Sequence, residues 1–192
     1  MSGTFPTSSG FTGIDFRSEN SNLRSDAING RTQVRKVGGH RWQFTVSFPP
    51  MKRAAFGPIN SFVQSQEGML DTFQIVLPEY SHSQETITGT LQASQAQTAG
   101  QSAINMDTAS GTLKAGDMFK FANHSKVYMA TADTALPGTV SFNPPLVASV
   151  ADNEIVTVNS VPFTVRLNND IQEAQAGIGG LFRYELDMIE AV

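Results

Sequence analysis

Residues 41–50 read RWQFTVSFPP, and the first eight of them alternate strictly between polar and apolar side chains. Trp42, Phe44, Val46 and Phe48 share one face, which is the period-2 pattern of a strand that is buried on one side. The two prolines that follow end the strand, because proline has no N–H to donate to a ladder. This stretch predicts one half-buried strand at the centre of the fold.

A helix and a second strand are predicted directly after it. The helix is expected from Pro58 to about residue 66, because proline suits a first helical turn and Ile59, Phe62 and Val63 form one apolar stripe. Alternating apolar residues then predict a strand at residues 70–77. The helix must lie across the sheet, since its stripe and the apolar strand faces each need a partner to be buried.

The two ends of the chain carry different patterns. Residues 1–30 are too polar to form a core, and their scattered aromatic residues predict that this segment docks on other elements. Residues 31–41 predict a short strand, with Gly38-Gly39 as the turn that follows it. At the other end, residues 181–189 alternate again and predict a long amphipathic strand.

The middle of the chain has a weaker pattern of short strands spaced by turn signals, which is typical of a small barrel or sandwich. These strands are predicted at residues 118–121, 126–131, 139–142, 155–158 and 161–167. We therefore predict a mainly β protein with two domains. Residues 1–83 and 163–192 form one sheet domain with a packed helix, and residues 84–162 form an inserted β module, a small barrel or sandwich. A single large β-sandwich is the alternative.

Composition limits the function classes. The chain has 192 residues, 40% of them hydrophobic, with a net charge of −4 and no cysteine. The net charge gives no general reason to bind nucleic acid, and the lack of cysteine excludes disulfides and thiolate metal sites. No apolar run approaches the roughly 18 residues that a membrane span needs, and the N-terminus lacks a signal pattern. We expect a soluble protein without membrane insertion or an export signal.

Sequence motifs of catalysis are absent: there is no P-loop, G-x-S-x-G, H-E-x-x-H or strand-bound G-x-G-x-x-G. His40, His82 and His124 are evenly spaced, but their neighbours differ and each is predicted to lie in a turn. Asp117 follows a glycine and is predicted to be a turn former rather than a catalytic acid. We expect no enzyme activity, cofactor or metal. A hydrolase site assembled from scattered residues is the less favoured alternative.

Charge is distributed unevenly. Residues 1–50 carry six basic and three acidic groups, and residues 166–192 carry two basic and five acidic groups. The basic cluster could be a solvated strand face, an interface with an acidic surface of a neighbouring copy, or a nucleic-acid contact, although it lacks the aromatic residues of a single-strand binder. The candidate subunit-interface residues are Arg24, Arg31, Arg35, Lys36, Arg41, Asp170 and Glu173.

Several runs resemble a known family. GHRWQFTVSFPPMKR (39–53), FVQSQEG (62–68) and FQIVLP (73–78) are similar to the sheet-and-helix core of tailed-phage tail proteins. LKAGD (113–117), KVY (126–128) and NPPL (143–146) are similar to a module that recurs in them. On these runs the chain resembles the distal tail protein, or baseplate hub protein, of tailed bacteriophages.

This resemblance implies a tail-tube-like β-sandwich with an inserted OB-like barrel. It further implies a homo-oligomeric ring, a hexamer by family likeness, in the virion tail after synthesis in the host cytoplasm. Its expected partners are the tail tube protein, hub or baseplate proteins and tail fibres. A tail-tube or head–tail connector protein is an alternative. A carbohydrate-binding β-module is another, for which Tyr80 and Tyr128 are the spare aromatic residues.

Overall fold

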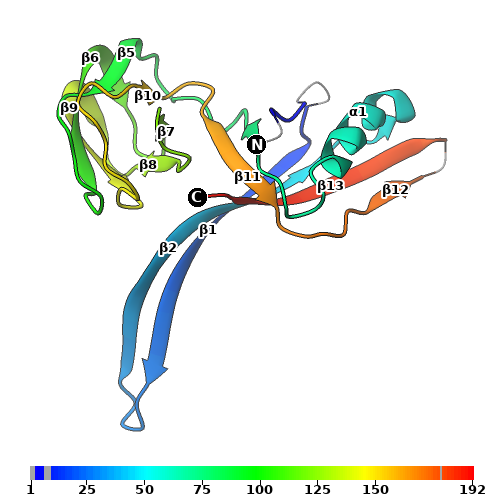
Figure 1. The fold of residues 1–192 in the computed structure, drawn as a ribbon, viewed down its shortest axis with the longest axis horizontal. Helices are drawn as coiled ribbons and strands as arrows, with labels where there is room; N and C mark the ends of the chain where they lie inside the picture. Colours follow the sequence, from blue (N-terminus) through cyan, green and yellow to red (C-terminus); the bar gives the residue numbers. More distant parts are fainter. Residues whose placement is uncertain (1–2, 7–9, 178) are drawn as a thin grey trace. The chain divides into compact units, whose positions relative to one another are not determined.

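The computed structural model describes residues 3–6, 10–177 and 179–192, and it is mainly β, with one helix in this part of the chain (Figure 1). The chain divides into two compact units. One contains Met1–Thr7, Thr72–Val165 and Ala191–Val192, and the other contains Ser8–Asp71 and Arg166–Glu190. The predicted fold class, a mainly β protein with a packed helix, is confirmed.

The unit of residues 8–71 and 166–190 is built on a long antiparallel hairpin. Its strands are β1 (Gly13–Asp26) and β2 (Thr32–Ser47). Strand β13 (Leu181–Glu190) pairs with β2 over residues 43–47. The short strands β3 (Met51–Lys52) and β12 (Ala174–Ala176) pair with the N-terminal part of β13. The hairpin therefore joins the sheet only near its open end.

The predicted alternation in the central strand is confirmed. Trp42, Phe44, Val46 and Phe48 are all buried, and the ring of Phe16 on β1 lies 4.8 Å from the ring of Trp42. Strand β13 repeats the pattern: its apolar residues 184, 186 and 188 are buried and its charged residues 183, 185 and 187 are exposed. Phe16 thus packs against another element, as predicted for the aromatic residues near the N-terminus, but from a long strand that the sequence did not indicate.

Helix α1 (Arg53–Gln64) covers the apolar side of β13. Phe56 stacks on Phe182 with ring centroids 4.6 Å apart, and it meets Tyr184 edge-on at 5.5 Å. The predicted start at Pro58 is wrong, because Pro58 lies inside the helix. Phe56, Ile59 and Val63 form the buried stripe, so the first turn is fixed by the burial of Phe56 and not by the proline signal.

The other unit contains a strand pair and a barrel. Strand β4 (Phe73–Val76) pairs with residues 162–165 of β11 (Pro162–Leu167). The N-terminal segment joins this pair, since the Phe5 amide donates to the Gln74 carbonyl at 2.7 Å. The predicted strand at residues 70–77 is therefore shorter than expected, because Leu70 is exposed ahead of it.

The barrel is one six-stranded sheet. Its strands are β5 (Thr88–Ala93), β6 (Ala103–Leu113), β7 (Met118–Phe121), β8 (Tyr128–Ala130), β9 (Thr134–Asn143) and β10 (Val156–Thr157), in the order β10-β7-β8-β9-β6-β5. The sheet curls until its ends nearly meet, because Ala93 exchanges backbone hydrogen bonds of 2.9 Å with Glu154 and Asn153. Strands β5 and β6 lie in a stretch for which no strand was predicted.

A single hydrophobic cluster fills the barrel, and all its members lie between Ile87 and Val158. Four of them are aromatic: Phe119 and Phe142 meet edge-on at 5.6 Å, and Phe121 and Tyr128 pack beside them. Every strand of this sheet lies inside the predicted insertion, residues 84–162. The domain boundaries themselves stay a prediction.

Candidate interface surfaces

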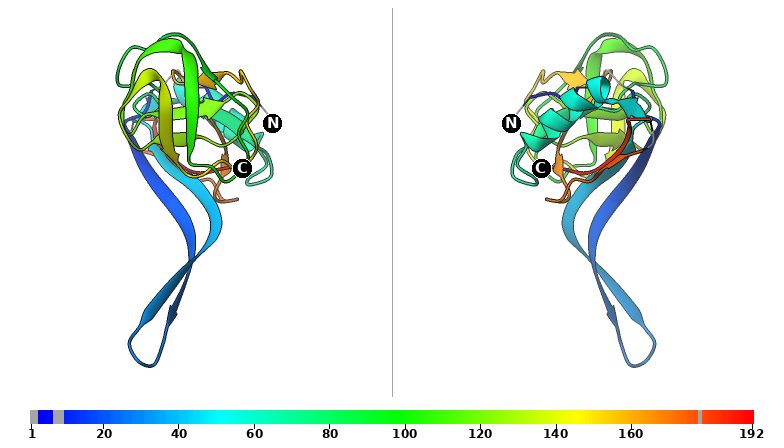
Figure 2. Two further views of the ribbon diagram at one scale, coloured as in Figure 1. Left: turned by 90° about the vertical axis from the view of Figure 1, so that its left-hand side faces the viewer. Right: turned by 90° about the vertical axis from the view of Figure 1, so that its right-hand side faces the viewer.

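The distal part of the β1–β2 hairpin, residues 18–41, is named the arm here. Its antiparallel ladder continues to the pair Asp26↔Thr32, far beyond the last residue of β2 that pairs with β13 (Figure 2). Every residue from 17 to 39 is exposed. Both faces of this two-stranded ribbon are therefore open to solvent within its unit.

The hairpin turn lies at the tip of the arm. The Ala27 amide donates to the Arg31 carbonyl at 2.9 Å, and Gly30 has a φ of +78°. The prediction of a turn at Gly38-Gly39 is wrong, because β2 runs through these residues. They have φ values of +100° and +79° and lie opposite a shift in the ladder between Asn20 and Asn22. The left-handed conformation that glycine permits is used here for a bulge instead.

All five predicted basic interface residues are exposed and lie on the arm: Arg24, Arg31, Arg35, Lys36 and Arg41. Arg24 forms an ion pair with Asp26 at 3.1 Å. The pKa of Asp26 is lowered mainly by a hydrogen bond from Thr32 and, to a smaller extent, by one from Arg24. The other four form no ion pair with any residue that the structure describes. The arm thus presents a concentration of unneutralised positive charge.

The arm also exposes large apolar side chains. The exposed fractions of Leu23, Val34 and Val37 are 61%, 63% and 68%, and Ile28 at the tip is fully exposed. Leu23 lies opposite Arg35 in the ladder, and Val34 lies opposite Arg24. Each face of the ribbon therefore combines an apolar residue with a basic one. Such a surface favours contact with a partner that is both apolar and acidic.

The same unit contains a hollow with acidic residues in its lining, named the groove here. Its volume is about 590 Å³. The lining residues are Ser47, Phe48, Pro50, Asn169, Ile171, Gln172, Glu173, Gln175, Arg183, Tyr184, Glu185 and Asp187. They come from the end of β2 and the residues just after it, from the segment before and within β12, and from residues 183–187 of β13.

The two predicted acidic residues have different surroundings. Glu173 lines the groove and is exposed. Asp170 lies outside the lining, and its carboxylate accepts a 2.9 Å hydrogen bond from the Met69 amide. Asp170 thereby ties the segment before β12 to the segment after α1. Its position makes it a support for the groove, whereas Glu173 is available to a partner.

Sequence reasoning missed two acidic residues of the groove. Glu185 and Asp187 are exposed on β13, and the Asp187 carboxylate accepts a 2.6 Å hydrogen bond from the Thr45 hydroxyl. Their alternate positions on the polar face of β13 were the signal that could have found them. Conversely, the acidic count of residues 166–192 included Glu190, which is buried and accepts a hydrogen bond from the Trp42 amide.

Beneath the groove, Tyr184 is a buried residue with an unusual environment. Its ring packs on Phe48 at 6.0 Å, and its hydroxyl has no hydrogen-bond partner among the residues that the structure describes. Burial raises the pKa of Tyr184 to about 12. The phenol therefore stays neutral and acts as part of the aromatic packing between α1 and β13.

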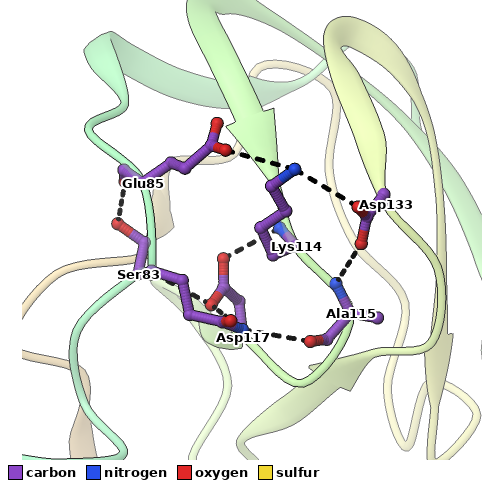
Figure 3. A network of polar contacts seen from close by, with 7 residues as sticks. Ser83, Glu85, Lys114, Ala115, Asp117 and Asp133 are labelled. Atoms are coloured by element: carbon purple, nitrogen blue, oxygen red, sulfur yellow. Dashed lines mark hydrogen bonds and ion pairs between the residues drawn. The ribbon is translucent and has the colours of Figure 1, made fainter.

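A network of polar contacts holds the segment that leads into β5 against two loops of the barrel (Figure 3). The Lys114 ammonium lies 3.1 Å from Glu85 and 3.3 Å from Asp133. Hydrogen bonds to Glu85 and then Asp133 raise the pKa of Lys114, and a hydrogen bond from the Ala115 amide is the main cause of the lowered pKa of Asp133. These exposed pairs hold three loops together.

Asp117 is a turn former, as predicted. Its buried carboxylate accepts from the Lys114 amide at 2.9 Å and from the Gln84 amide at 3.0 Å (Figure 3). Both oxygens are therefore occupied by backbone groups that shape the turn and the entering segment. The carboxylate supports structure at this position and is not available to a substrate.

The predicted location in a turn is wrong for His40 and His82, whereas the His124 amide closes a turn by donating to the Phe121 carbonyl at 3.1 Å. His40 lies within β2 and hydrogen-bonds Ser18 at 2.9 Å. His82 forms an isolated bridge with Asn159. His124 is buried, with one ring nitrogen 2.9 Å from the Tyr128 hydroxyl and the other 3.3 Å from the Ser149 carbonyl.

Within the described ranges, no group of three or more His, Cys, Asp or Glu side chains could hold a metal ion. In the same ranges, no helix has the length and apolar character of a membrane span.

Two comparisons with known proteins bear on these surfaces. Residues 84–161 match the family described as "Distal tail protein pb9, B domain". The chain is also 25% identical over 166 residues to the distal tail protein pb9 of Escherichia phage T5, which covers 83% of this chain and 80% of that protein. These matches confirm the resemblance predicted from the sequence. The chain is thus similar to the distal tail protein of a tailed bacteriophage, and its residues 84–161 match the B domain of that protein.

Proposed function

We propose that this chain forms a ring at the distal end of a phage tail, where it joins the tail tube to the baseplate or tail-tip hub. The similarity to the distal tail protein pb9, which extends over four fifths of both chains, is the observation that carries this proposal. By family resemblance the ring has six copies, and its outer surface offers attachment to tail fibres. The protein is made in the host cytoplasm and then built into the virion.

The arm supports association with further copies. A two-stranded hairpin alone is marginally stable in water, and this one exposes both faces with large apolar side chains. A contact between two different surfaces of one chain closes into a ring when its rotation allows. Opposite charge on the arm and on the 166–192 region suits a head-to-tail contact of this kind. We place the candidate residues Arg24, Arg31, Arg35, Lys36, Arg41 and Glu173 at this contact, with Asp170 supporting it.

We also propose that residues 84–162 are an inserted module. The hydrophobic cluster of the barrel draws only on residues 87–158, so the barrel has a core of its own. Replacing residues 84–162 by a short Gly-Ser linker should leave a remainder that melts cooperatively. Aggregation, or melting without a transition, would favour the single-sandwich alternative instead.

Other functions have less support. The carbohydrate-binding alternative depended on Tyr80 and Tyr128, but Tyr128 lies in the barrel core with its hydroxyl bonded to His124. A tail-tube or head–tail connector role shares the same sheet-and-helix core, and the match to a distal tail protein favours the distal ring over it. We propose a structural role without catalysis.

A reconstruction of intact tails with this chain labelled tests the proposal. We expect a closed ring of identical copies at the distal end, in contact with the tube on one side and the hub on the other. A single copy on the tail axis, or isolated copies on the outside, would contradict it. The native mass of the purified chain is only a supporting measurement, because without the tube as a template the chain can stay monomeric.

A further inference from the structure

We propose that the arm of one copy docks in the groove of a second copy. This inference rests on the proposed ring and specifies which two surfaces make its contact. The occupant is a second copy of this chain, and the contacting segment is the basic and apolar part of the arm, residues 23–36. The receiving surface is the groove beside β12 and β13.

Charge complementarity is the first argument. The arm carries five basic and two acidic residues, and four of the basic ones form no ion pair with a described residue. The groove contributes Glu173, Glu185 and Asp187, with Arg183 as its one basic lining residue. Neither Glu173 nor Glu185 pairs with a cation in the described part of the chain. The two surfaces therefore have opposite sign and unused charge.

Apolar complementarity is independent of charge and points to the same pairing. Leu23 and Val34 are exposed on opposite faces of the arm. In the groove lining, Ile171 is 78% exposed. The residue beside it, Asp170, is bonded to Met69, which is also exposed. The volume of about 590 Å³ lies within the range of pockets that bind ligand-sized groups, about 300–1,000 Å³. The groove thus has room for side chains of the arm.

The arm cannot reach the groove of its own chain. Ser47, which lines the groove, is the last residue of β2, and Arg35 lies twelve residues away along the same strand. A strand rises about 3.3 Å per residue, so the distance along the ribbon is roughly 40 Å. The ladder pairs the two strands on both sides of the bulge at Gly38-Gly39 and keeps the ribbon extended over this length. A groove on another copy is therefore the one that the arm can fill.

Cross-linking tests this pairing directly, because the chain has no cysteine of its own. Gln33→Cys on the arm and Gln172→Cys in the groove are combined in one chain, and a short bifunctional maleimide is added. The matched control combines Gln33→Cys with Ala99→Cys, an exposed position on the barrel. We expect the arm–groove variant to give a series of cross-linked oligomers on a denaturing gel, both at raised protein concentration and in assembled tails. The control should give no such series.

The outcomes separate this inference from the proposed ring. A closed oligomer whose arm–groove variant gives no cross-linked series would overturn the inference and leave the ring intact. Equal series from both variants would also overturn it, since the contact would then be non-specific. A chain that remains monomeric at every concentration and forms no ring in tails would overturn the ring and the inference together.

Charge reversal gives a second test of the same pairing. Arg35→Glu with Lys36→Glu should lower the yield of oligomer at least tenfold at a fixed protein concentration, and Glu173→Lys with Glu185→Lys should do the same. Combining all four changes in one chain should restore oligomer formation, because the opposite charges face each other again. All four side chains are exposed, so unchanged melting temperatures serve as the folding control. Failure of the combined variant to recover would contradict the pairing.

Discussion

The two halves of the β1–β2 hairpin belong to the same pair of strands but have opposite environments. Near its open end, the ladder is covered: Phe16 packs on Trp42 and Phe44, and β13 pairs with the other edge of β2. In the arm the same ladder continues with both faces exposed. Both halves of the hairpin thus have the same backbone pairing, and they differ in whether their side chains are buried. The covered half stabilises the monomer, and the exposed half is left for association.

The largest expected effect is the loss of a buried aromatic residue from the covered half. Trp42 is 2% exposed, and truncating a buried aromatic side chain to alanine costs about 3–5 kcal/mol. Trp42→Ala should therefore lower the free energy of unfolding by that amount, measured by urea denaturation. The matched control is Val34→Ala in the arm, which should change stability by less than about 0.5 kcal/mol. Equal losses would mean that the arm is packed in the monomer.

A smaller effect is expected at a buried polar residue of the barrel. His124 bonds both Tyr128 and the Ser149 carbonyl, and leaving buried polar groups without a partner costs about 1–3 kcal/mol each. His124→Ala should lower the melting temperature of the chain measurably. His40→Ala should have little effect, because His40 is half-exposed and bonds an exposed serine. If both substitutions were harmless, the burial of His124 would not contribute to stability.

The covered half of the hairpin, the arm and the barrel also show how much of the fold the sequence could predict. Alternation identified the strands at Trp42–Phe48 and residues 181–189, because the burial of one strand face makes apolar residues recur at every second position. The arm has no such pattern, since neither face is buried, and β1 was missed for that reason. In the barrel, β5 and β6 are rich in small and polar residues, and their pairing depends on partners far away in the chain. Long-range pairing of this kind leaves no local signal.

The candidate site shows the same limit. The basic residues were found because charge is visible in composition, and they do lie together on the arm. The acidic surface that could receive them was not found, because Glu185 and Asp187 come together with Glu173 only when residues 169–175 fold beside β13. Glu190 was counted as surface charge, although the alternation of β13 places it on the buried face with Leu186 and Met188, where its carboxylate accepts a hydrogen bond from the Trp42 amide.

The bulge in the arm should produce a local effect. Gly39 has a φ of +79°, a conformation that costs a residue with a Cβ about 1–2 kcal/mol. Gly39→Ala should loosen the arm beyond the bulge while the melting temperature of the chain stays nearly unchanged, because little packing connects the two halves. Limited trypsin digestion measures this, since Arg31, Arg35 and Lys36 lie beyond the bulge. Cleavage at the wild-type rate would show that the bulge does not control arm order.

The smallest effect on folding, and the sharpest contrast between the halves, is expected when the arm is removed. Residues 21–39 can be replaced by an Asn-Gly turn, which then joins the ladder pair Asn20 and His40 with the appropriate twist. The covered half keeps its ladder, its aromatic packing and its pairing with β13, so the monomer should unfold within about 1 kcal/mol of the wild-type chain. Association should be lost, because the exposed apolar and basic side chains of the arm are gone. Analytical ultracentrifugation measures association, and urea denaturation of the same samples measures stability. A variant that melts normally but no longer forms oligomers separates the two halves as described. A shortened chain that unfolds would mean that the arm stabilises the monomer, and a shortened chain that still forms the ring would mean that its copies meet through other surfaces.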